Sequence, residues 1–329
     1  MMLMFAILLL GIVLLRYYES YAIKKNILAV PGSRTLHETL TPRGGGIVFS
    51  LLFVFSVVIL YFIGTINFNI LMVLGFGAFI ASIFGFIDDI VDISASYKLA
   101  MQCILAIWSI YWLEASILIN WVPYWLSLSI ITLLLVWILN LYNFMDGVDG
   151  MASSGGLFFS LSLALILLHE GHPQTAILFF ILAGSLGGFI FFNWPPASIF
   201  MGDSGSLFLG YTFGSLLLFT VTTGSLTIWT WLVVFGYFFS DTMVTQIARI
   251  IIVKRWYSAH RSHAYQNLAR ITGSHFKITM GVTTFHLIWI LPLAFWSVLQ
   301  PNFALIAVAL ALLPGVVLAY LYGPLFSSS

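Results

Sequence analysis

Long apolar runs separated by short polar connections repeat along the whole chain. About 20 apolar residues cross the hydrocarbon core of a bilayer as a helix. Eleven segments approach that length, at approximately 2–22, 44–63, 70–87, 98–116, 124–142, 153–169, 174–192, 206–222, 227–248, 277–299 and 302–322. The pattern therefore predicts an all-α, polytopic membrane protein of about 11 transmembrane helices.

The composition supports this prediction. Hydrophobic residues make up 61% of the chain and charged residues 7%, and the mean hydropathy is +1.07. A soluble domain carries roughly 25% charged residues, so most of this surface must face lipid. We see no repeat of fixed period, and Cys103 is the single cysteine, so neither a disulfide nor a thiolate metal site is expected. Residues 1–329 are interpreted as one membrane domain.

The basic residues give the chain a direction. If the first segment runs inward, all twelve Lys and Arg lie at or near the inner face. Such a bias indicates the cytoplasmic side. It predicts an outside N-terminus, a cytoplasmic C-terminus and cytoplasmic loops at about 23–43, 88–97, 143–152, 193–205 and 249–276. Residues 1–15 could also be a signal-peptide core, but no basic region precedes them, so we expect a retained helix.

All seven aspartates fall on this same predicted face, whereas Glu114 and Glu170 lie near the other. Solvated loops would explain the Lys and Arg, but acids contribute little to the positive-inside bias. Several of the aspartates also adjoin apolar runs directly, where a carboxylate is costly without a partner. We therefore favour a functional cluster, with the site at the cytoplasmic face.

The spacing of the acids adds detail. In "GFIDDIVDIS", Asp88 and Asp92 are four residues apart and would share a helical face, with Asp89 pointing about 100° away. In "NLYNFMDGVDGMASSGG", Asn143, Asp146 and Asp149 recur every three residues. Crowded carboxylates repel one another unless a cation neutralises them. Oxygen ligands without thiols select a hard ion, Mg²⁺ or Mn²⁺.

A further aspartate stands between glycines in "IFMGDSGSLFLG", where a helix resumes. Asp203 could bind the metal there, while neighbouring backbone N–H groups face a phosphate. It could instead cap the helix, with help from Ser204. The two interpretations are compatible.

Two predicted cytoplasmic loops carry the cations that would bind an anion. The late loop "VKRWYSAHRSHAYQNLAR" contains His260, Arg261 and His263, which suit phosphate but would also suit anionic lipid headgroups. The first loop places Arg34, His37 and Arg43 before three glycines. That loop is no P-loop, and by itself it is a weak signal.

Together these features indicate phosphoryl transfer between a water-soluble donor and a lipid-borne acceptor. A transporter would hold its acids near the midplane, and the GxGD motif of intramembrane aspartyl proteases fails because position 200 is Phe. Asp241 is either a ligand at the cytoplasmic face or a buried partner of Arg249. The remaining histidines are interpreted as loop or interface residues: His169, His172, His275 and His286.

At this point the sequence resembles a known family. The motifs "PGSRTLHETLTPRGGG", "GFIDDIVDIS", "NLYNFMDGVDGMA", "NWPPASIFMGDSGSLFLG" and "HRSHAYQNLAR" occur in family order in the polyprenyl-phosphate N-acetylhexosamine-1-phosphate transferases, the bacterial glycosyltransferase family 4. The resemblance implies Mg²⁺-dependent transfer of sugar-1-phosphate from a UDP-N-acetylhexosamine to undecaprenyl phosphate, with release of UMP.

The resemblance also implies roles for individual residues. Asp88 and Asp89 match the paired acids implicated in catalysis, and Asp203 matches the Mg²⁺ ligand and catalytic acid. The residues expected to bind substrate are Asn143, Asp146, Asp149, His260, Arg261, His263, Arg34, His37 and Arg43. The paired acids would deprotonate the lipid phosphate, position the metal or form an aspartyl-phosphate, and the sequence leaves these routes open.

One motif narrows the branch of the family. The muramoyl-peptide branch has three histidines in the late loop, whereas this chain has "HRSHAYQ", which resembles the O-antigen initiating branch. We therefore expect a multi-pass enzyme of the bacterial inner membrane that acts in lipopolysaccharide or other envelope synthesis. A peptidoglycan step is the alternative. Nucleic acid is not an expected partner, and the sequence leaves the oligomeric state open, a homodimer included.

Overall fold

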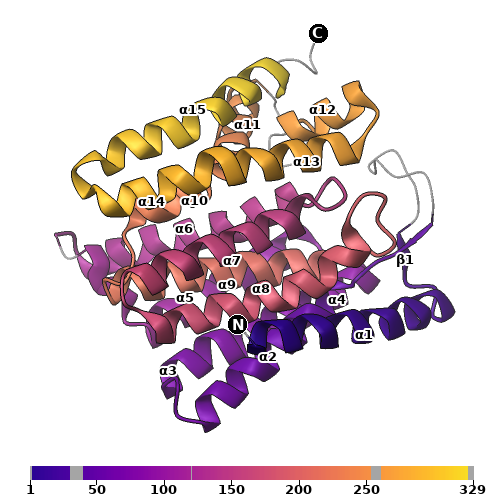
Figure 1. The fold of residues 1–329 in the computed structure, drawn as a ribbon, viewed down its shortest axis with the longest axis horizontal. Helices are drawn as coiled ribbons and strands as arrows, with labels where there is room; N and C mark the ends of the chain where they lie inside the picture. The colour runs from indigo at the N-terminus through magenta and orange to yellow at the C-terminus, as the bar shows by residue number, and fades with distance from the viewer. Residues whose placement is uncertain (1, 30–39, 120, 253–260, 325–329) are drawn as a thin grey trace.

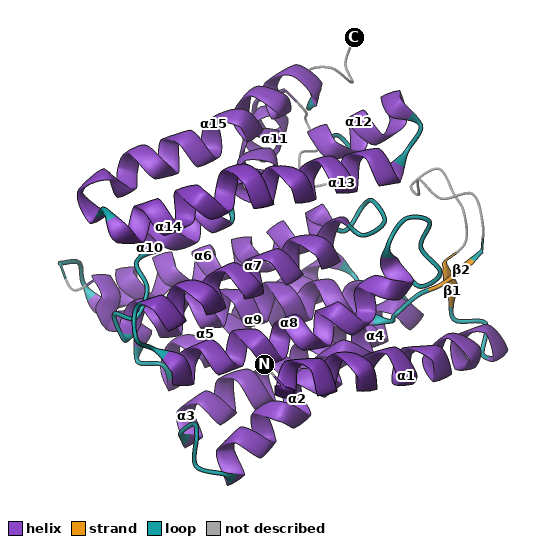
Figure 2. Cartoon of the chain, in the orientation of Figure 1, coloured by secondary structure: helices purple, strands orange, loops and turns teal. Residues whose placement is uncertain are grey.

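The computed structural model describes residues 2–29, 40–119, 121–252 and 261–324. These residues form a bundle of mostly long helices, with one short antiparallel strand pair, β1 (Leu28–Ala29) and β2 (Thr41–Pro42) (Figure 1, Figure 2). The helices of the first half are α1 (Met2–Lys24), α2 (Gly46–Phe62), α3 (Phe68–Ile70), the π-helix η1 (Leu71–Gly77), α4 (Ala78–Val91), α5 (Ala95–Trp112), the 3₁₀ helix η2 (Ala115–Ile119) and α6 (Tyr124–Met145).

The second half continues the bundle. Its helices are α7 (Met151–His169), α8 (Pro173–Asn193), α9 (Asp203–Thr222), α10 (Ile228–Val234), α11 (Gly236–Ile252), α12 (Ala264–Thr272), α13 (His275–Phe285), the π-helix η3 (His286–Ile290), α14 (Leu291–Leu299), the 3₁₀ helix η4 (Pro301–Phe303) and α15 (Ala304–Tyr322). In Figure 1, α13, α14 and α15 form a layer above α7 and α8, and α1 lies along the opposite side.

The helices have the length and composition of membrane spans. In the described residues, eight helices or unbroken helical runs are long and apolar enough to cross a bilayer, and α2 is a shorter apolar helix. The protein is therefore an all-α, polytopic membrane protein, as predicted. One segment differs, because the predicted span 227–248 is interrupted at Phe235, which separates α10 from α11.

Helix ends also differ from the predicted loops, and this matters for the acids. Asp88 and Asp89 belong to the last turn of α4 rather than to a loop beginning at residue 88. Asp92 ends that helix in the left-handed region, at φ +57°. It therefore leaves the helical spiral, and the predicted common face of Asp88 and Asp92 is wrong. The two buried acids of α4 are instead the neighbours Asp88 and Asp89.

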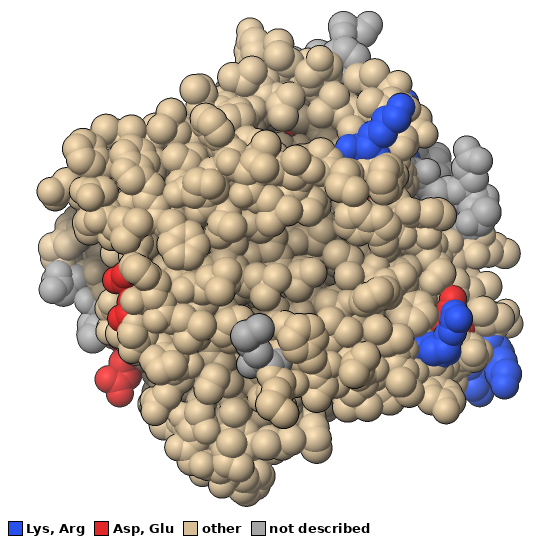
Figure 3. Space-filling model, viewed as in Figure 1, with Lys and Arg blue, Asp and Glu red and all other residues tan. Residues whose placement is uncertain are grey.

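Charge is sorted to the ends of the bundle. In Figure 3 the visible Lys and Arg lie at the end that carries the strands and α12, and acids also appear at the opposite end. The broad surface between them is uncharged in this view. We call the end with β1, β2 and α12 the polar end. It is the end that the positive-inside bias predicts to be cytoplasmic.

Candidate active site

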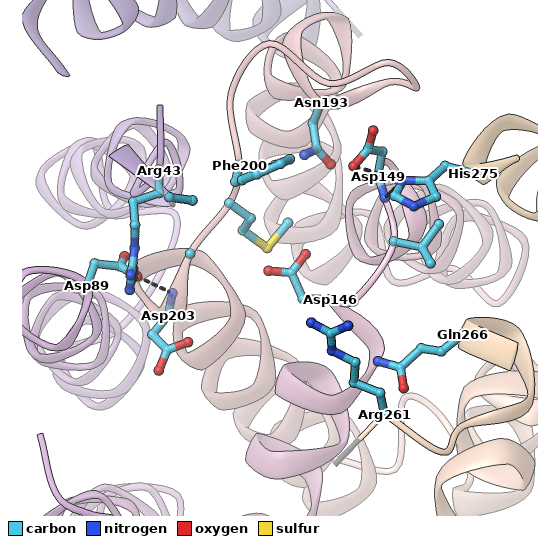
Figure 4. Close-up of a pocket in the computed structure, with 15 residues that line it drawn as sticks. Arg43, Asp89, Asp146, Asp149, Asn193, Phe200, Asp203, Arg261, Gln266 and His275 are labelled. Atoms are coloured by element: carbon cyan, nitrogen blue, oxygen red, sulfur yellow. Dashed lines mark hydrogen bonds and ion pairs between the residues drawn. The ribbon is translucent and has the colours of Figure 1, made fainter. Parts of the chain in front are cut away.

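A cavity of about 310 Å³ opens at the polar end, within the usual range for ligand pockets. Figure 4 shows its side chains converging from the first loop, from the ends of α4, α6 and α8, and from the starts of α9, α12 and α13. Four carboxylates and two guanidinium groups are among the described residues that line it: Asp89, Asp146, Asp149, Asp203, Arg43 and Arg261. These six charged side chains come from five separate segments of the sequence.

The Asp89 carboxylate is fully occupied by partners from the protein. Its oxygens accept hydrogen bonds from the backbone N–H groups of Asp203 (2.9 Å) and Ser204 (3.1 Å) and from Arg43 Nη2 (2.7 Å) (Figure 4). It thereby caps the first turn of α9 from another helix. The expectation that these N–H groups are free to face a phosphate is wrong. The N-cap residue of α9 is Gly202, and the Asp203 carboxylate pairs with Lys98 instead, so the predicted capping role of Asp203 is not found.

Gly202 allows this arrangement. Its φ of +71° lies in the region that other L-residues disfavour. A Cβ atom at this position would also overlap Asp89 Oδ2. The glycine before Asp203 is therefore required both by backbone conformation and by the close approach of the Asp89 carboxylate.

A lysine joins the other two acids of this wall. Lys98 Nζ lies 3.2 Å from Asp203 Oδ2 and forms an ion pair with Asp88, which also accepts a hydrogen bond from the Ile93 N–H at 2.7 Å. From the sequence, Lys98 was expected only to contribute one charge at the inner face. Its position six to ten residues after the aspartates, in the first turn of an apolar helix, was the available signal.

The turn after α6 is held by a tyrosine of α12. The Tyr265 hydroxyl donates to the Phe144 carbonyl (2.6 Å) and accepts from the Gly147 N–H (2.9 Å). Gln266 Nε2 donates to the same hydroxyl at 3.2 Å. Asp146 lies between the two anchored backbone positions, so α12 positions this carboxylate without touching it.

Asp149 has partners where Asp146 does not. Its carboxylate lies 3.1 Å from His275 Nδ1 and accepts a hydrogen bond from the Ala197 N–H, also at 3.1 Å. The interpretation of His275 as a loop or interface residue is therefore wrong, because the side chain lines the cavity. His275 begins α13, 126 residues after Asp149, and no local sequence pattern indicates that the two are paired.

Asp146 and Arg261 are the unpaired charges of the cavity. Within the described residues, the Asp146 carboxylate has no hydrogen bond or ion pair. Burial, followed by the charges of Asp203, Asp89 and Asp149, raises the pKa of Asp146 well above its ordinary value. Two nitrogens of Arg261, Nε and Nη2, are buried and likewise have no partner among the described residues. In Figure 4 the Arg261 guanidinium extends toward Asp146, whose carboxylate points away from it.

Other predicted site residues lie outside this lining. Asn143 is in the last turn of α6, where its Oδ1 accepts a weak 3.4 Å hydrogen bond from Ser206. His263 is buried with its Nδ1 3.4 Å from Asp241 Oδ1, and its ring stacks on Phe144. His260, Arg34 and His37 lie outside the described residues.

Asp241 holds the start of α12. This fully buried side chain of α11 accepts hydrogen bonds from the backbone N–H groups of Ala264 (3.0 Å) and Tyr265 (3.2 Å). Thr245 also donates to it, at 3.2 Å. The sequence left Asp241 between two roles. The structure makes it the anchor of the helix that carries Tyr265 and Gln266.

The cavity suits a hard divalent ion only in part. In the described ranges, no three His, Cys, Asp or Glu side chains are grouped as a complete metal site. Mg²⁺, however, takes one or two carboxylates and fills its shell with water and substrate phosphate. The partnerless Asp146 and the cavity-lining Asp203 fit that smaller requirement.

Comparison with known proteins decides the family. The sequence profile described as glycosyl transferase family 4 matches residues 70–221, which include Asp88, Asp89, Asp146 and Asp203. A probable undecaprenyl-phosphate N-acetylglucosaminyl 1-phosphate transferase of Bacillus subtilis (strain 168) is 30% identical over 278 residues, covering 81% of this chain and 75% of the relative. The chain belongs to glycosyl transferase family 4.

Other members of glycosyl transferase family 4 resemble the chain to a similar degree. An undecaprenyl-phosphate alpha-N-acetylglucosaminyl 1-phosphate transferase of Thermotoga maritima is 26% identical over 272 residues, 82% of this chain and 81% of the relative. A phospho-N-acetylmuramoyl-pentapeptide-transferase of Prochlorococcus marinus (strain MIT 9312) is 31% identical over 229 residues, 62% of each chain. The names of these relatives thus specify two different transferred groups.

Proposed function

We propose that this protein transfers N-acetylhexosamine-1-phosphate from a UDP-sugar to undecaprenyl phosphate, in the inner membrane of a bacterium. A phosphate oxygen of the lipid forms a bond to the sugar-bearing phosphorus. The bond from that phosphorus to the UMP oxygen breaks, and UMP leaves with the electron pair. The observation that carries the proposal is the cavity itself, where acids and guanidinium groups from distant motifs meet at the end of an apolar bundle.

Three charged side chains that line the cavity are assigned to the substrate and the metal. Arg261 is assigned to the diphosphate, since a guanidinium fork pairs with two phosphate oxygens and this one has two unpartnered nitrogens. Asp146 and Asp203 are assigned to Mg²⁺, with Mn²⁺ as a substitute. When bound, the ion would neutralise charge that develops on the diphosphate.

The paired acids are assigned to holding the site in shape. Asp89 already accepts hydrogen bonds from α9 and Arg43, and Asp88 is engaged by Lys98 and the Ile93 N–H. Carboxylate oxygens that already accept hydrogen bonds and ion pairs are less available as nucleophiles. This favours direct attack by the lipid phosphate over an aspartyl-phosphate intermediate.

The identity of the donor distinguishes the two enzyme activities that remain. The "HRSHAYQ" form of the late loop favours a UDP-N-acetylhexosamine that initiates O-antigen or a related envelope polysaccharide, and UDP-N-acetylmuramoyl-pentapeptide is the competitor. Transport is disfavoured because the cavity is built from helix ends rather than from the middle of the bundle.

UMP release by purified protein tests the proposal. The protein is incubated with undecaprenyl phosphate, Mg²⁺ and a panel of donors that includes both UDP-N-acetylhexosamines and UDP-N-acetylmuramoyl-pentapeptide. We expect release that needs lipid, metal and an intact Asp203, and that is fastest with a UDP-N-acetylhexosamine. Asp203→Asn is compared with Asp92→Asn, which changes an acid of the same end that lies outside the cavity. Equal turnover in both variants would refute the assignment of Asp203.

A further inference from the structure

A second cavity lies beside the active site, on the far side of α13. It has a volume of about 210 Å³ and lies among α11, α12, α13 and α15. Its walls are apolar except for one charged side chain, Lys277, and they include Gly281, Phe285 and Leu318. In Figure 1 α13 and α15 lie in the same layer, with α12 at their polar end.

The two cavities use opposite faces of α13. His275 lines the active site, and Thr279, one turn later, donates to the Asp149 carbonyl at 2.6 Å. Lys277 and Gly281 are also one turn apart, but each is displaced by two residues, or about 200°, around the helix. The second cavity is therefore separated from the active site by the body of α13.

The shape of the second cavity is that of a groove entered from one membrane interface. Lys277 lies near the polar end of α13, and Phe285 lies eight residues further into the bundle. At 1.5 Å per residue this is about 12 Å, which is close to the roughly 15 Å of hydrocarbon in one leaflet. The groove thus has one cation at the level of the headgroups and apolar walls through most of a leaflet.

Two observations show that the protein leaves the groove open. Within the described residues, Lys277 Nζ has no hydrogen bond or ion pair. A Cβ atom built on Gly281 would meet no atom within 4 Å. A glycine inside a helix costs about 1 kcal/mol relative to alanine, and here no close helix contact requires it.

We propose that this groove binds an anionic phospholipid, with one acyl chain between α13 and α15 and the phosphate at Lys277. A negative headgroup complements Lys277, the charged side chain among the described residues that line the groove, and the apolar walls complement the chain. This site is independent of the transferase reaction, and its ligand is a component of the bilayer rather than the polyprenyl acceptor.

Lipid retention tests the proposal without any activity assay. The protein is reconstituted in bilayers containing phosphatidylglycerol and phosphatidylcholine, extracted, washed with detergent and examined by native mass spectrometry. We expect wild type to retain phosphatidylglycerol, and Lys277→Gln to retain about fivefold less, as the loss of one lysine–phosphate attraction implies. Gly281→Leu should abolish retention by filling the groove.

Matched variants separate occupancy from folding. Gly281→Ala raises helix propensity as Gly281→Leu does, but adds only one methyl group, so it should still retain the lipid. Lys25→Gln removes an exposed lysine of the same end away from the groove and should also retain it. Equal retention in all variants would overturn the proposal. So would retention of phosphatidylcholine, or displacement of the phospholipid by added undecaprenyl phosphate.

Discussion

The two walls of the active-site cavity differ in whether their charged side chains have partners within the protein. The wall formed by α4 and the start of α9 supplies its own partners: Arg43 and two backbone N–H groups for Asp89, and Lys98 for Asp88 and Asp203. The facing wall is formed by the turn after α6 and the segment before α12. It pairs Asp149 with His275 but leaves Asp146 and Arg261 without partners among the described residues.

This difference separates architecture from ligand binding. A charge neutralised within the protein fixes the positions of helices, and adding a substrate changes its environment little. A buried charge without a partner is costly, and it becomes favourable only when a ligand supplies the opposite charge. We therefore expect substitutions of Asp88, Asp89 and Arg43 to act mainly on stability. Substitutions of Asp146, Arg261 and the metal-assigned Asp203 should act mainly on turnover.

The largest effect should follow from Asp146→Asn. The substitution keeps size and polarity but removes the negative charge assigned to the metal. We expect kcat for UMP release to fall about 10²–10³-fold, as for other groups that stabilise charge in the transition state. Asp92→Asn serves as control and should change kcat little. A kcat for Asp146→Asn within about twofold of wild type would contradict the assignment of Asp146.

Arg261→Lys should act on donor affinity. A lysine keeps the charge but loses the planar fork that pairs with two phosphate oxygens. A charged hydrogen bond contributes about 1.5–3 kcal/mol, so KM for the UDP-sugar should rise roughly 10–100-fold with a smaller change in kcat. Arg16→Lys, an exposed cation paired with Glu19, should leave KM unchanged. A fall in kcat at constant KM would assign Arg261 to the transition state alone.

Asp241 should affect both stability and turnover. It holds the start of α12, and α12 in turn holds the turn that carries Asp146. Asp241→Ala leaves two buried N–H groups without acceptors and should cost about 1–3 kcal/mol of stability, together with about a tenfold loss of kcat. Asp241→Asn keeps one acceptor oxygen and should recover part of both. Thermal unfolding and kcat are measured on the same samples. If kcat stayed constant while stability fell, Asp241 would be a structural residue only.

Much of this protein could be predicted from local pattern. Lengths of apolar runs gave the helices, and the common face of the aspartates gave the end at which they meet. These features depend on hydropathy and on neighbouring residues, which a sequence displays directly. The interruption at Phe235 and the left-handed Asp92 were missed because each is a single-residue change of backbone within an otherwise regular pattern.

The partners within the site could not be predicted in the same way. Lys98 and Asp203 are separated by 105 residues in the sequence, and Asp149 and His275 by 126. Which of several acids receives a cation depends on helix packing to within a few ångströms. The sequence predicted that Asp89 and Asp203 lie at the same face. It did not predict that Asp89 accepts hydrogen bonds from the backbone N–H groups of Asp203 and Ser204, which were expected to face a phosphate.

The smallest effect concerns the stability of metal-free protein. The pKa of Asp146 is raised in the folded state by burial and by neighbouring acids. The folded protein therefore holds this proton more tightly than the unfolded chain does. The stability contributed by this group is present below the ordinary aspartate pKa and is lost as the pH rises through the raised value. With a chelator present, this group should therefore make the fold less stable near pH 8 than near pH 4.

Asp146→Asn removes this ionisation, so the variant should unfold a few degrees above wild type near pH 8 and at about the same temperature near pH 4. Taking the difference between the two proteins cancels the titration of groups that do not interact with Asp146. Mg²⁺ added near pH 8 should stabilise wild type more than the variant and reduce the gap, because the ion supplies the missing partner. A difference in unfolding temperature that is the same at both pH values would mean that Asp146 is already neutralised in the folded protein, and the contrast between the two walls would be lost.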